Sequence, residues 1–377
     1  MQQDHYFDYA AATPVDADVA RAMLPFASEN FANPSALYAA AHDARRALDR
    51  ARATVAHQLG ARSNEIVFTG SCTEANNMAI HGLLARYPEG KVLYSAIEHD
   101  AVRKVAQTYN SEQIPVDRSG RVDIDVLGKM LSDPSVVLVS VMYVNNEIGT
   151  IQDLAAIARC IRAAKTGARS KRPLIFHSDA AQAGNYLPLS VHRLGVDMLS
   201  LNAAKLYGPK GVGCLYVNSA LELAPQTLGG GQEFGLRSGT ENVAGCVGVA
   251  VALEKAASLR SEESTRLTLL RDEMIGQLQS AGWAINGTGR HRIANNISIY
   301  SPLIDNETAV MKLSAQGFSV ATGSACHAAS QELSPTLAAI GRHDEEIRGS
   351  LRITLGRFTT PAVARELVAA LNRLLAS

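Results

Sequence analysis

Apolar runs of strand length alternate with amphipathic stretches of helix length through roughly residues 60–250. The apolar runs stand at residues 65–69, 91–95, 136–144, 174–177 and 213–217. Strands that are buried on both faces of a sheet read as nearly continuous apolar runs, and helices between such strands connect parallel neighbours. This alternation predicts an α/β fold whose large domain is a mainly parallel sheet flanked by helices.

The pattern changes near residue 250, where apolar residues recur at helical spacing within charged sequence. Strand-like segments follow at residues 296–300 and 317–321, and an amphipathic helix ends the sequence. These elements indicate a smaller α+β domain that the first dozen residues complete. We predict a large domain over residues 14–255 and a small domain formed by residues 1–13 and 256–377.

The bulk composition excludes several classes of function. The 377 residues include 36 basic and 36 acidic side chains, so no overall field would attract nucleic acid or an acidic membrane. No basic region followed by an apolar run opens the sequence, and no apolar stretch is long enough to span a bilayer. The five cysteines lie far apart and lack the spacing of metal ligands. We expect a cytoplasmic protein without a metal site, membrane contact or direct contact with nucleic acid.

A lysine and a carboxylate at two predicted strand ends suit one kind of chemistry. Lys205 follows an apolar run and precedes a glycine-rich turn, and Asp179 ends another apolar run 26 residues earlier. We expect neighbouring strands to deliver both side chains to one cleft. An enzyme of pyridoxal phosphate needs this pair, because the lysine holds the aldehyde of the cofactor and the aspartate keeps its ring nitrogen protonated.

Three further segments admit both a structural and a functional interpretation. Residues 69–77 follow a strand and open a helix, so they form either a capped helix start or a cradle for a phosphate group. His99 follows the strand at residues 91–95. Its imidazole either has a structural role or stacks on a pyridine ring and transfers protons. Asn146 ends the most apolar strand, where its amide either shapes a turn or donates to the cofactor, a task that Gln182 could share.

Two loops rich in small residues carry the remaining candidates. Residues 229–242 include Arg237 and Thr240, which are either anion-binding donors or parts of a surface loop. Cys326 stands among glycine, serine and alanine, so we expect an exposed thiol on a mobile loop. An exposed thiol is open to oxidation, which favours a chemical role for Cys326.

Taken together and in order, these segments resemble the cysteine desulfurases, which are class V, fold-type I enzymes that use pyridoxal phosphate. The likeness runs nearly from end to end and rests on many motifs rather than on one. The motifs are residues 6–14, 33–35, 65–69, 98–99, 145–149, 177–182, 205–211, 237–240, 323–326 and 351–359.

The resemblance implies a role for each candidate residue at the cofactor. Lys205 would hold the cofactor, Asp179 would pair with its ring nitrogen, and His99 would stack on its ring. The other implied contacts are Asn146 and Gln182 at the ring, Cys72, Thr73 and Asn202 at the phosphate, and Thr240 at the phosphate of the partner subunit. An obligate homodimer is therefore expected.

The resemblance also implies the reaction, which is the conversion of L-cysteine to L-alanine. Arg352 would grip the substrate carboxylate with Asn33 nearby, and the amine of Lys205 would remove the Cα proton. The thiolate of Cys326 would attack the substrate sulfur and keep it as a persulfide. The implied catalytic residues are Lys205, Cys326 and His99. The sulfur would pass to an acceptor protein of iron–sulfur cluster assembly or of tRNA and nucleic-acid thiolation.

The sequence departs from the family pattern around the phosphate. Most relatives carry a histidine directly before the lysine, whereas this chain has Ala204, whose methyl group donates no hydrogen bond. We predict weaker anchoring of the phosphate, or compensation by Thr73 and neighbouring backbone. Residues 70–72 also replace the commoner order of small residues. Housekeeping relatives continue into a tail that helps to dock the iron–sulfur scaffold, and this sequence ends at Ser377, which leaves that partnership open.

Two alternatives stay open at this point. Another class V enzyme, such as a selenocysteine lyase, would carry the same residues, while an aminotransferase needs no thiol, so Cys326 argues against it. A non-catalytic binding protein could keep the fold without the cofactor, as Ala204 suggests. Lys205, Asp179 and His99 are all present and favour the enzyme.

Overall fold

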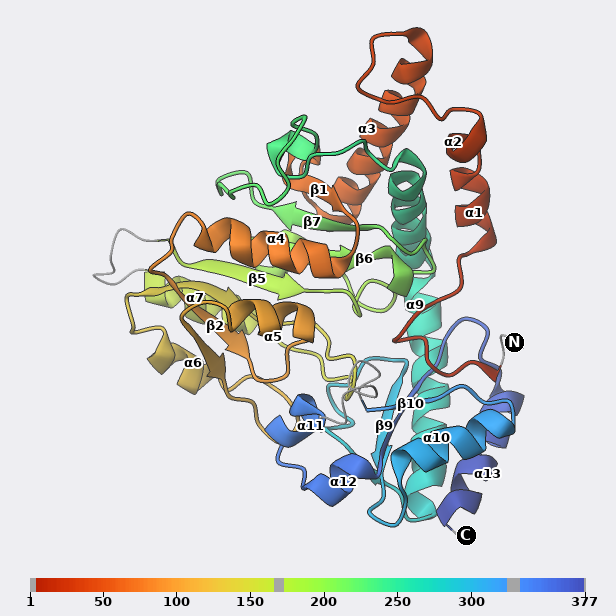
Figure 1. Cartoon of the computed structure of the whole chain (residues 1–377). Coiled ribbons are helices and arrows are strands. Elements are labelled where there is room, and N and C mark those ends of the chain that lie inside the picture. The colour runs from red at the N-terminus through yellow and green to blue at the C-terminus, as the bar shows by residue number, and fades with distance from the viewer. Residues whose placement is uncertain (1–4, 166–172, 324–332, 376–377) are drawn as a thin grey trace.

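Two β-sheets organise the protein in a computed structural model that describes residues 5–165, 173–323 and 333–375. Figure 1 shows a large sheet in the upper part of the molecule and a small sheet below it. Helix α9 (Val243–Ser280) passes alongside both and connects them. The fold thus offers a junction between two sheets at which side chains from distant segments can meet.

The large sheet has seven strands in the order β1-β7-β6-β5-β4-β2-β3. Neighbouring strands from β3 to β6 pair in parallel, whereas β7 runs antiparallel to both β1 and β6. The mainly parallel sheet predicted from the apolar runs is therefore confirmed. Its strands are β1 (Ile66–Thr69), β2 (Lys91–Ser95), β3 (Ser111–Ile114), β4 (Val136–Ser140), β5 (Ile175–Asp179), β6 (Met198–Asn202) and β7 (Gly213–Val217).

Burial on both faces explains why the central strands read as apolar runs. All five residues of β4 are buried. In β2, Leu93 packs into one hydrophobic cluster, and its neighbours Val92 and Tyr94 pack into another. Successive side chains of a strand point to opposite faces, so each central strand contributes to two cores, and most of its positions are apolar. The buried polar residues Ser95, Ser140 and Asp179 stand at the carboxyl ends of these strands.

Helices cover both faces of the large sheet. Buried residues of α4 (Cys72–Leu84) and α5 (Asp100–Ala106) belong to one core, and Figure 1 shows these two helices side by side over the strands. The opposite core takes buried residues from α3 (Ala39–Leu59), α6 (Ile124–Met130), α7 (Leu154–Lys165) and α9. The short helices and turns are α1 (Ala17–Met23), α2 (Pro25–Ser28), η2 (Ser63–Glu65), α8 (Val191–Leu194), η3 (Ala203–Lys205) and η4 (Glu233–Gly235).

The small sheet is antiparallel, with four strands in the order β10-β11-β9-β8. The strand predicted at residues 296–300 is present as β9, whereas the segment predicted at residues 317–321 forms only the two-residue strand β10. The elements are β8 (Ala284–Ile285), β9 (Asn296–Tyr300), α10 (Asn306–Ala315), β10 (Ala321–Thr322), α11 (Pro335–Ala339), α12 (Asp344–Arg348), β11 (Ser350–Thr354) and α13 (Pro361–Leu375). Helix α9 runs without a break through residue 255, where we predict the domain boundary, and that division stays a prediction.

The N-terminal segment, residues 5–13, lies between the two sheets. Tyr6 and Asp8 form isolated bridges with Ser319 and Thr354 of the small-sheet region. On the other side, the backbone N–H of Thr13 donates to the carbonyl of Ala204 at 2.9 Å, directly before Lys205. The segment therefore connects the small-sheet region to the turn that carries Lys205.

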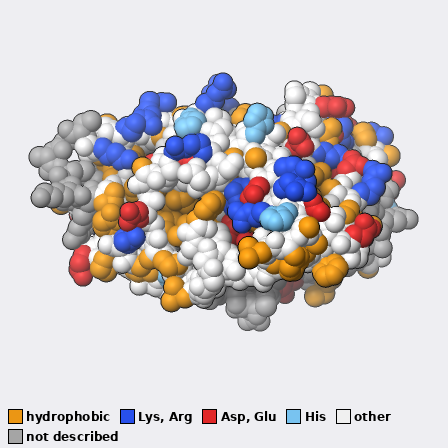
Figure 2. Space-filling model, turned by 90° about the horizontal axis from the view of Figure 1, so that it is seen from above, with side chains coloured by type: hydrophobic (Ala, Val, Ile, Leu, Met, Phe, Trp, Pro, Cys, Tyr) orange, Lys and Arg blue, Asp and Glu red, His pale blue; other side chains and the backbone are white. Residues whose placement is uncertain are grey.

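On the face of the molecule seen in Figure 2, charges of both signs are interspersed rather than gathered by sign. Figure 2 shows lysine, arginine and acidic side chains interspersed on the face in view, with hydrophobic patches between them. Within residues 5–165, 173–323 and 333–375, none of the helices is long and apolar enough to cross a membrane. The same ranges contain no group of three or more histidine, cysteine and acidic side chains that could hold a metal ion.

Candidate active site

A cavity of about 260 Å³ lies beyond the carboxyl ends of β2, β4, β5 and β6, where the N-terminal segment and β11 close it. Carboxyl ends of parallel strands are where α/β proteins place their ligands. Nine predicted site residues line this cavity: Cys72, Thr73, His99, Asn146, Asp179, Gln182, Asn202, Lys205 and Arg352. The structure thus brings together residues that are spread over most of the sequence.

Asp179 and Lys205 reach the cavity from neighbouring parallel strands. Asp179 is the last residue of β5 and pairs with Ser200 of β6, and Lys205 ends the turn that follows β6. The amide of Asn76 donates to Asp179 Oδ2 at 2.6 Å, and the backbone N–H of Ala181 donates to Oδ1 at 2.9 Å. Asp179 is buried, and among the described residues no lysine, arginine or histidine forms an ion pair with it. A buried carboxylate with only neutral donors favours a cationic ligand.

The amine of Lys205 is held by the N-terminal segment. Its Nζ donates a hydrogen bond to the carbonyl of Ala11, which also lines the cavity. The side-chain amide of Gln182 donates to the carbonyl of the adjacent Ala10 at 3.0 Å. Two predicted cofactor residues therefore contact the same short piece of backbone.

The start of α4 forms part of the cavity wall. Ser71 caps the helix by accepting from the N–H of Glu74 at 3.1 Å, and Cys72 and Thr73 follow at its first positions. A Cβ on Gly213 would lie 2.8 Å from the backbone carbon of Ser71, so only glycine lets β7 pack this closely. The side chain of Cys72 turns toward Asp179 Oδ1 at 3.4 Å, which leaves the helix N-terminus itself, a good site for an anion, facing the cavity.

His99 is the N-cap of α5, and its Nδ1 accepts a hydrogen bond from the N–H of Ala101 at 3.0 Å. That bond places the ring proton on Nε2 and fixes the ring against the helix start. The structural interpretation of His99 therefore holds, and the ring still lines the cavity. Both predicted roles are compatible with one position.

Arg352 lies on β11 with its side chain buried at the opposite wall. Its Nη2 donates to Asp8 Oδ1 at 2.7 Å, and its Nη1 lies 3.5 Å from the carbonyl of Asn146. Its Nε is buried without a hydrogen-bond partner in the described part of the chain. A donor left open beside a cavity suits a carboxylate ligand.

Comparison with known proteins decides the family. The family model described as aminotransferase class V matches residues 5–364. The chain belongs to the class V aminotransferase family. Among curated relatives, the cysteine desulfurase IscS of Dictyoglomus turgidum is 40% identical over 369 residues, which is 96% of this chain and 91% of that protein. The cysteine desulfurase IscS of Methanosarcina thermophila is 39% identical over 363 residues, covering 94% and 88%.

Several solved structures share the fold over nearly the whole chain. A NifS-like protein aligns with a TM-score of 0.91 at 31% identity, covering 98% of this chain and 99% of that one. A NifS-like protein from Rickettsia africae aligns with a TM-score of 0.89 at 27% identity, covering 99% of each chain. The structure titled SspA in complex with cysteine aligns with a TM-score of 0.82 at 34% identity, covering 94% and 99%.

The cavity of this class V protein fits pyridoxal phosphate, the cofactor of the family. Asp179 offers a buried negative charge for a protonated ring nitrogen, and Lys205 offers an amine on the same side of the cavity. The N-terminus of α4 offers backbone donors for a phosphate. Ring, aldehyde and phosphate each have a suitable group, so the residues present are those that the cofactor needs.

Two buried acids of this class V site were missed by the sequence reasoning. Glu98 and Glu147 both line the cavity. Burial raises the pKa of Glu98 to about 8, and burial raises the pKa of Glu147 to about 7. Ser334 donates to Glu147 Oε2 at 2.5 Å. Each acid stands beside a predicted residue just after a buried strand, a signal that could have identified them.

Two of the predicted residues that the structure describes, Asn33 and Thr240, are not among those that line the cavity. Asn33 is exposed, and its side chain accepts from the N–H of Ser35 at 2.9 Å, as in a turn. Thr240 is exposed in the loop after β7. Cys326 lies outside the described residues. The predicted roles of Asn33, Thr240 and Cys326 stay predictions.

Proposed function

We propose that this class V protein is a cysteine desulfurase that converts L-cysteine to L-alanine and transfers the sulfur to Cys326. The observation that carries the proposal is one cavity in which Lys205 and Asp179 face the buried Arg352. The relatives named cysteine desulfurase, at 39–40% identity, and the solved relative in complex with cysteine support the same substrate.

Pyridoxal phosphate, when bound, supplies an electron-accepting ring that stabilises negative charge at the substrate Cα. Lys205 would hold its aldehyde, Asp179 its ring nitrogen, and Thr73 with the start of α4 its phosphate. His99, Asn146, Gln182, Asn202 and Cys72 would make the remaining contacts. All of these residues line the one cavity.

The residues of the chain divide the chemistry by position. Arg352 orients the substrate by its carboxylate, using the Nε edge that Asp8 leaves open. The amine of Lys205 takes the proton from Cα. The thiolate of Cys326 attacks the substrate sulfur, so a sulfur–sulfur bond forms and the Cβ–sulfur bond breaks with its electron pair left on the carbon side. Cβ then gains one proton, and Cα regains the proton that Lys205 removed, which completes alanine.

The residues that flank the Cys326 segment support its role. A Cβ on Gly323 would lie 3.4 Å from Glu147 Oε2, and Ser334 donates to the same oxygen. Glu147 lines the cavity. The described residues before and after the segment 324–332 therefore both lie close to Glu147, a residue of the cavity wall, which supports the proposed role of Cys326.

Incubation with L-cysteine tests the proposal. We expect wild-type enzyme to release alanine and sulfide in the presence of a reductant, and Cys326→Ser to lose at least most of the sulfide. Cys160→Ser is the matched control, because Cys160 is half-buried beside α6 and does not line the cavity. Equal sulfide release from wild type and Cys326→Ser would refute the persulfide role of Cys326.

We also propose that the enzyme is a homodimer in which Thr240 of one subunit reaches the phosphate of the other. Thr240 is exposed and does not line the cavity of its own chain. Large hydrophobic side chains are exposed in two segments near the top of Figure 1, namely Leu24, Phe31, Leu37 and Tyr38 in one and Leu228 and Phe234 in the other. Exposed apolar residues in this number favour a protein interface.

The sulfur acceptor is proposed to be a cytoplasmic protein of iron–sulfur cluster assembly or of tRNA and nucleic-acid thiolation. A persulfide must leave the cavity by contact with a second protein. Transfer of radioactive sulfur from labelled cysteine to purified acceptors of both kinds tests this choice. Label on neither kind would contradict it.

A further inference from the structure

Tyr207 has an unusual backbone conformation two residues after Lys205. Its φ angle is +59°, and Tyr207, Glu233 and Phe234 are the non-glycine residues with positive φ in the described chain. A side chain is disfavoured in this region, and such residues persist only where their surroundings hold them. Tyr207 is also buried at 1% exposure. Its surroundings should therefore show what holds it.

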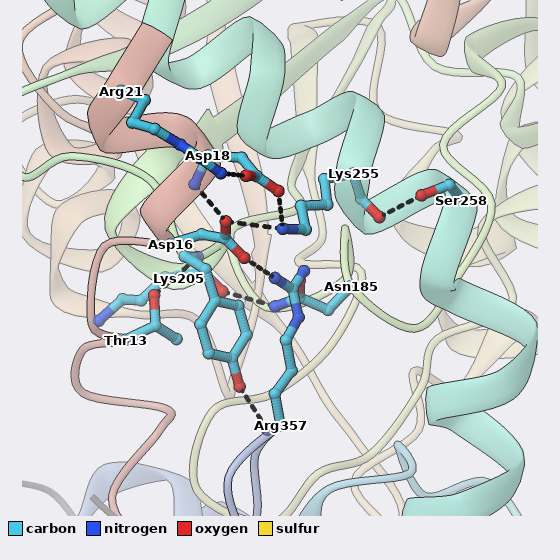
Figure 3. A network of polar contacts seen from close by, with 10 residues as sticks. Thr13, Asp16, Asp18, Arg21, Asn185, Lys205, Lys255, Ser258 and Arg357 are labelled. Atoms are coloured by element: carbon cyan, nitrogen blue, oxygen red, sulfur yellow. Dashed lines mark hydrogen bonds and ion pairs between the residues drawn. The ribbon is translucent and has the colours of Figure 1, made fainter. Parts of the chain in front are cut away.

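On one side, Thr13 clamps the turn that carries Lys205. The backbone N–H of Tyr207 donates to Thr13 Oγ1 at 2.7 Å, and the same hydroxyl donates to the carbonyl of Ala204 at 3.0 Å. Thr13 thus bridges the residues on both sides of Lys205 and Leu206. The amide of Asn185 adds a bond to the carbonyl of Lys205 itself at 2.7 Å (Figure 3).

On the other side, Arg357 holds the ring and hydroxyl of Tyr207. The backbone N–H of Arg357 donates to the Tyr207 hydroxyl at 2.8 Å, and its guanidinium lies 4.0 Å from the centre of the ring. Arg357 Nη1 in turn donates to Asp16 Oδ2 at 3.1 Å, and Lys255 donates to the other oxygen of Asp16 at 2.7 Å. Figure 3 shows Asp16 between these two cations.

Arg357 also connects the lysine turn to the substrate arginine. Arg352 lies on β11, and the chain reaches Arg357 five residues later. Along the way, the N–H of Thr354 donates to the carbonyl of Phe7 at 2.8 Å. A Cβ on Gly356 would lie 2.3 Å from the ring of Tyr9, so this stretch packs directly on the N-terminal segment. The path from Arg352 to the turn is short and fixed at both ends.

We propose that Thr13, Tyr207 and Arg357 are positioning residues that fix the direction of the Lys205 side chain and thereby its reactivity toward the cofactor aldehyde. The inference rests on the proposed role of Lys205. Hydrogen bonds on both sides of Lys205 hold its backbone in the observed conformation. In this conformation, Nζ reaches the carbonyl of Ala11. Loosening either clamp frees the amine to point elsewhere.

Four variants separate positioning from stability. Thr13→Val removes the bridging hydroxyl at nearly constant shape, and Thr13→Ser restores it. Tyr207→Phe removes the acceptor of the Arg357 N–H. Lys255→Met is the control, because it breaks an ion pair with the same Asp16 without touching the turn.

The readout is attachment of pyridoxal phosphate to apoenzyme, followed by the visible absorbance band and by borohydride trapping on Lys205. We expect Thr13→Val and Tyr207→Phe to slow attachment about tenfold to a hundredfold, as misplacement of a reacting group by about 1 Å does. The midpoint pH at which the visible absorbance band changes wavelength should shift by about half a unit or more. Thr13→Ser and Lys255→Met should match wild type in both measurements.

The inference would be overturned if Thr13→Val and Tyr207→Phe attached the cofactor at rates within twofold of wild type and the pH of their absorbance change lay within about 0.2 units of the wild-type value. An equal effect of Lys255→Met would also overturn it, because the network would then act only through stability. Wild-type protein that never acquires the band would overturn the proposed function and this inference together. The two failures are therefore distinguishable.

Discussion

At the scale of single residues, Glu98 is a buried acid whose ionisation opposes folding. Burial raises the pKa of Glu98 from 4.5 to about 8. The folded protein therefore binds this proton more tightly than the unfolded chain. The contribution of this proton to the stability of the fold is complete at pH values below 4.5, the pKa of the group in the unfolded chain. It is lost as the pH rises through about 8, the pKa in the folded protein.

Glu98→Gln should reduce the loss of stability between about pH 5 and pH 9. Glutamine keeps an oxygen for the N–H of Met142 and the hydroxyl of Ser95 but has no proton to lose. We expect the variant to gain about 4 kcal/mol in free energy of unfolding, relative to wild type, on going from pH 5 to pH 9. Urea denaturation at both pH values measures this. The exposed Glu262→Gln is the control. A Glu98→Gln difference that does not change with pH would contradict the prediction.

Ala204→His should tighten the binding of pyridoxal phosphate. Ala204 is half-buried between Asn202, which lines the cavity, and Lys205. An added donor to a charged phosphate contributes about 1–3 kcal/mol, which is about fivefold to 150-fold in affinity. Equilibrium titration of apoenzyme measures the dissociation constant. Ala204→Leu adds bulk without a donor and should not tighten binding. An unchanged affinity of Ala204→His for pyridoxal phosphate would contradict the prediction that the phosphate is weakly anchored.

Residue types and strand ends in the sequence were enough to predict Lys205 and Asp179, which the structure brings to one cavity. The same reasoning missed Glu98 and Glu147, because a carboxyl group after a strand reads as solvated until its burial is known. Thr240 could not be assigned from one folded chain either. In the proposed dimer, Thr240 acts in the neighbouring subunit, so its partner would not lie in its own chain.

At the scale of elements, a buried ion pair fixes the loop that carries Thr240. Arg52 of α3 donates to both carboxylate oxygens of Glu233 at 2.7 Å, and the side chains are only 7% and 2% exposed. The N–H of Phe68 donates to the same carboxylate at 2.7 Å. Glu233 and Phe234 both have positive φ, so this pair holds a disfavoured backbone in place.

Removal of one partner should destabilise the protein strongly. We expect Arg52→Met to lower the free energy of unfolding by about 3–5 kcal/mol, because it leaves the Glu233 charge buried without a cation. Chemical denaturation measures this. Asp49→Asn breaks the exposed ion pair with Arg45 on the same helix and should cost less than about 1 kcal/mol. A loss below about 1 kcal/mol in Arg52→Met would contradict the burial argument.

The sequence predicted the ends of a strand correctly where the strand and the apolar run have the same length. β9 occupies residues 296–300 as predicted, whereas the run at residues 136–144 forms a strand only to Ser140. The backbone beyond Ser140 turns to give the N–H of Met142 to Glu98. The reversed direction of β7 was not visible either, because apolar runs carry no sign of strand direction.

At the scale of the whole molecule, mixed dimers test whether Thr240 acts in the partner subunit. A Lys205→Ala subunit paired with a Thr240→Ala subunit should retain about half of the wild-type activity, because one site keeps its own Lys205 and receives an intact Thr240. Both substitutions on one subunit, paired with wild type, should impair both sites. Separately tagged subunits allow each mixed dimer to be purified and assayed. The opposite ranking would show that Thr240 serves its own chain.

The position of residues 5–13 between the two sheets bears on how the site forms during synthesis. Ala10 and Ala11 leave the ribosome early, while Thr354, whose hydroxyl accepts from the N–H of Ala10 at 2.9 Å, leaves late. Chains emerge N-terminus first, so the large sheet can fold while its first segment waits without a partner. A ribosome-bound chain halted before residue 350 would hold Lys205 and Asp179 but would lack the wall that carries Arg352.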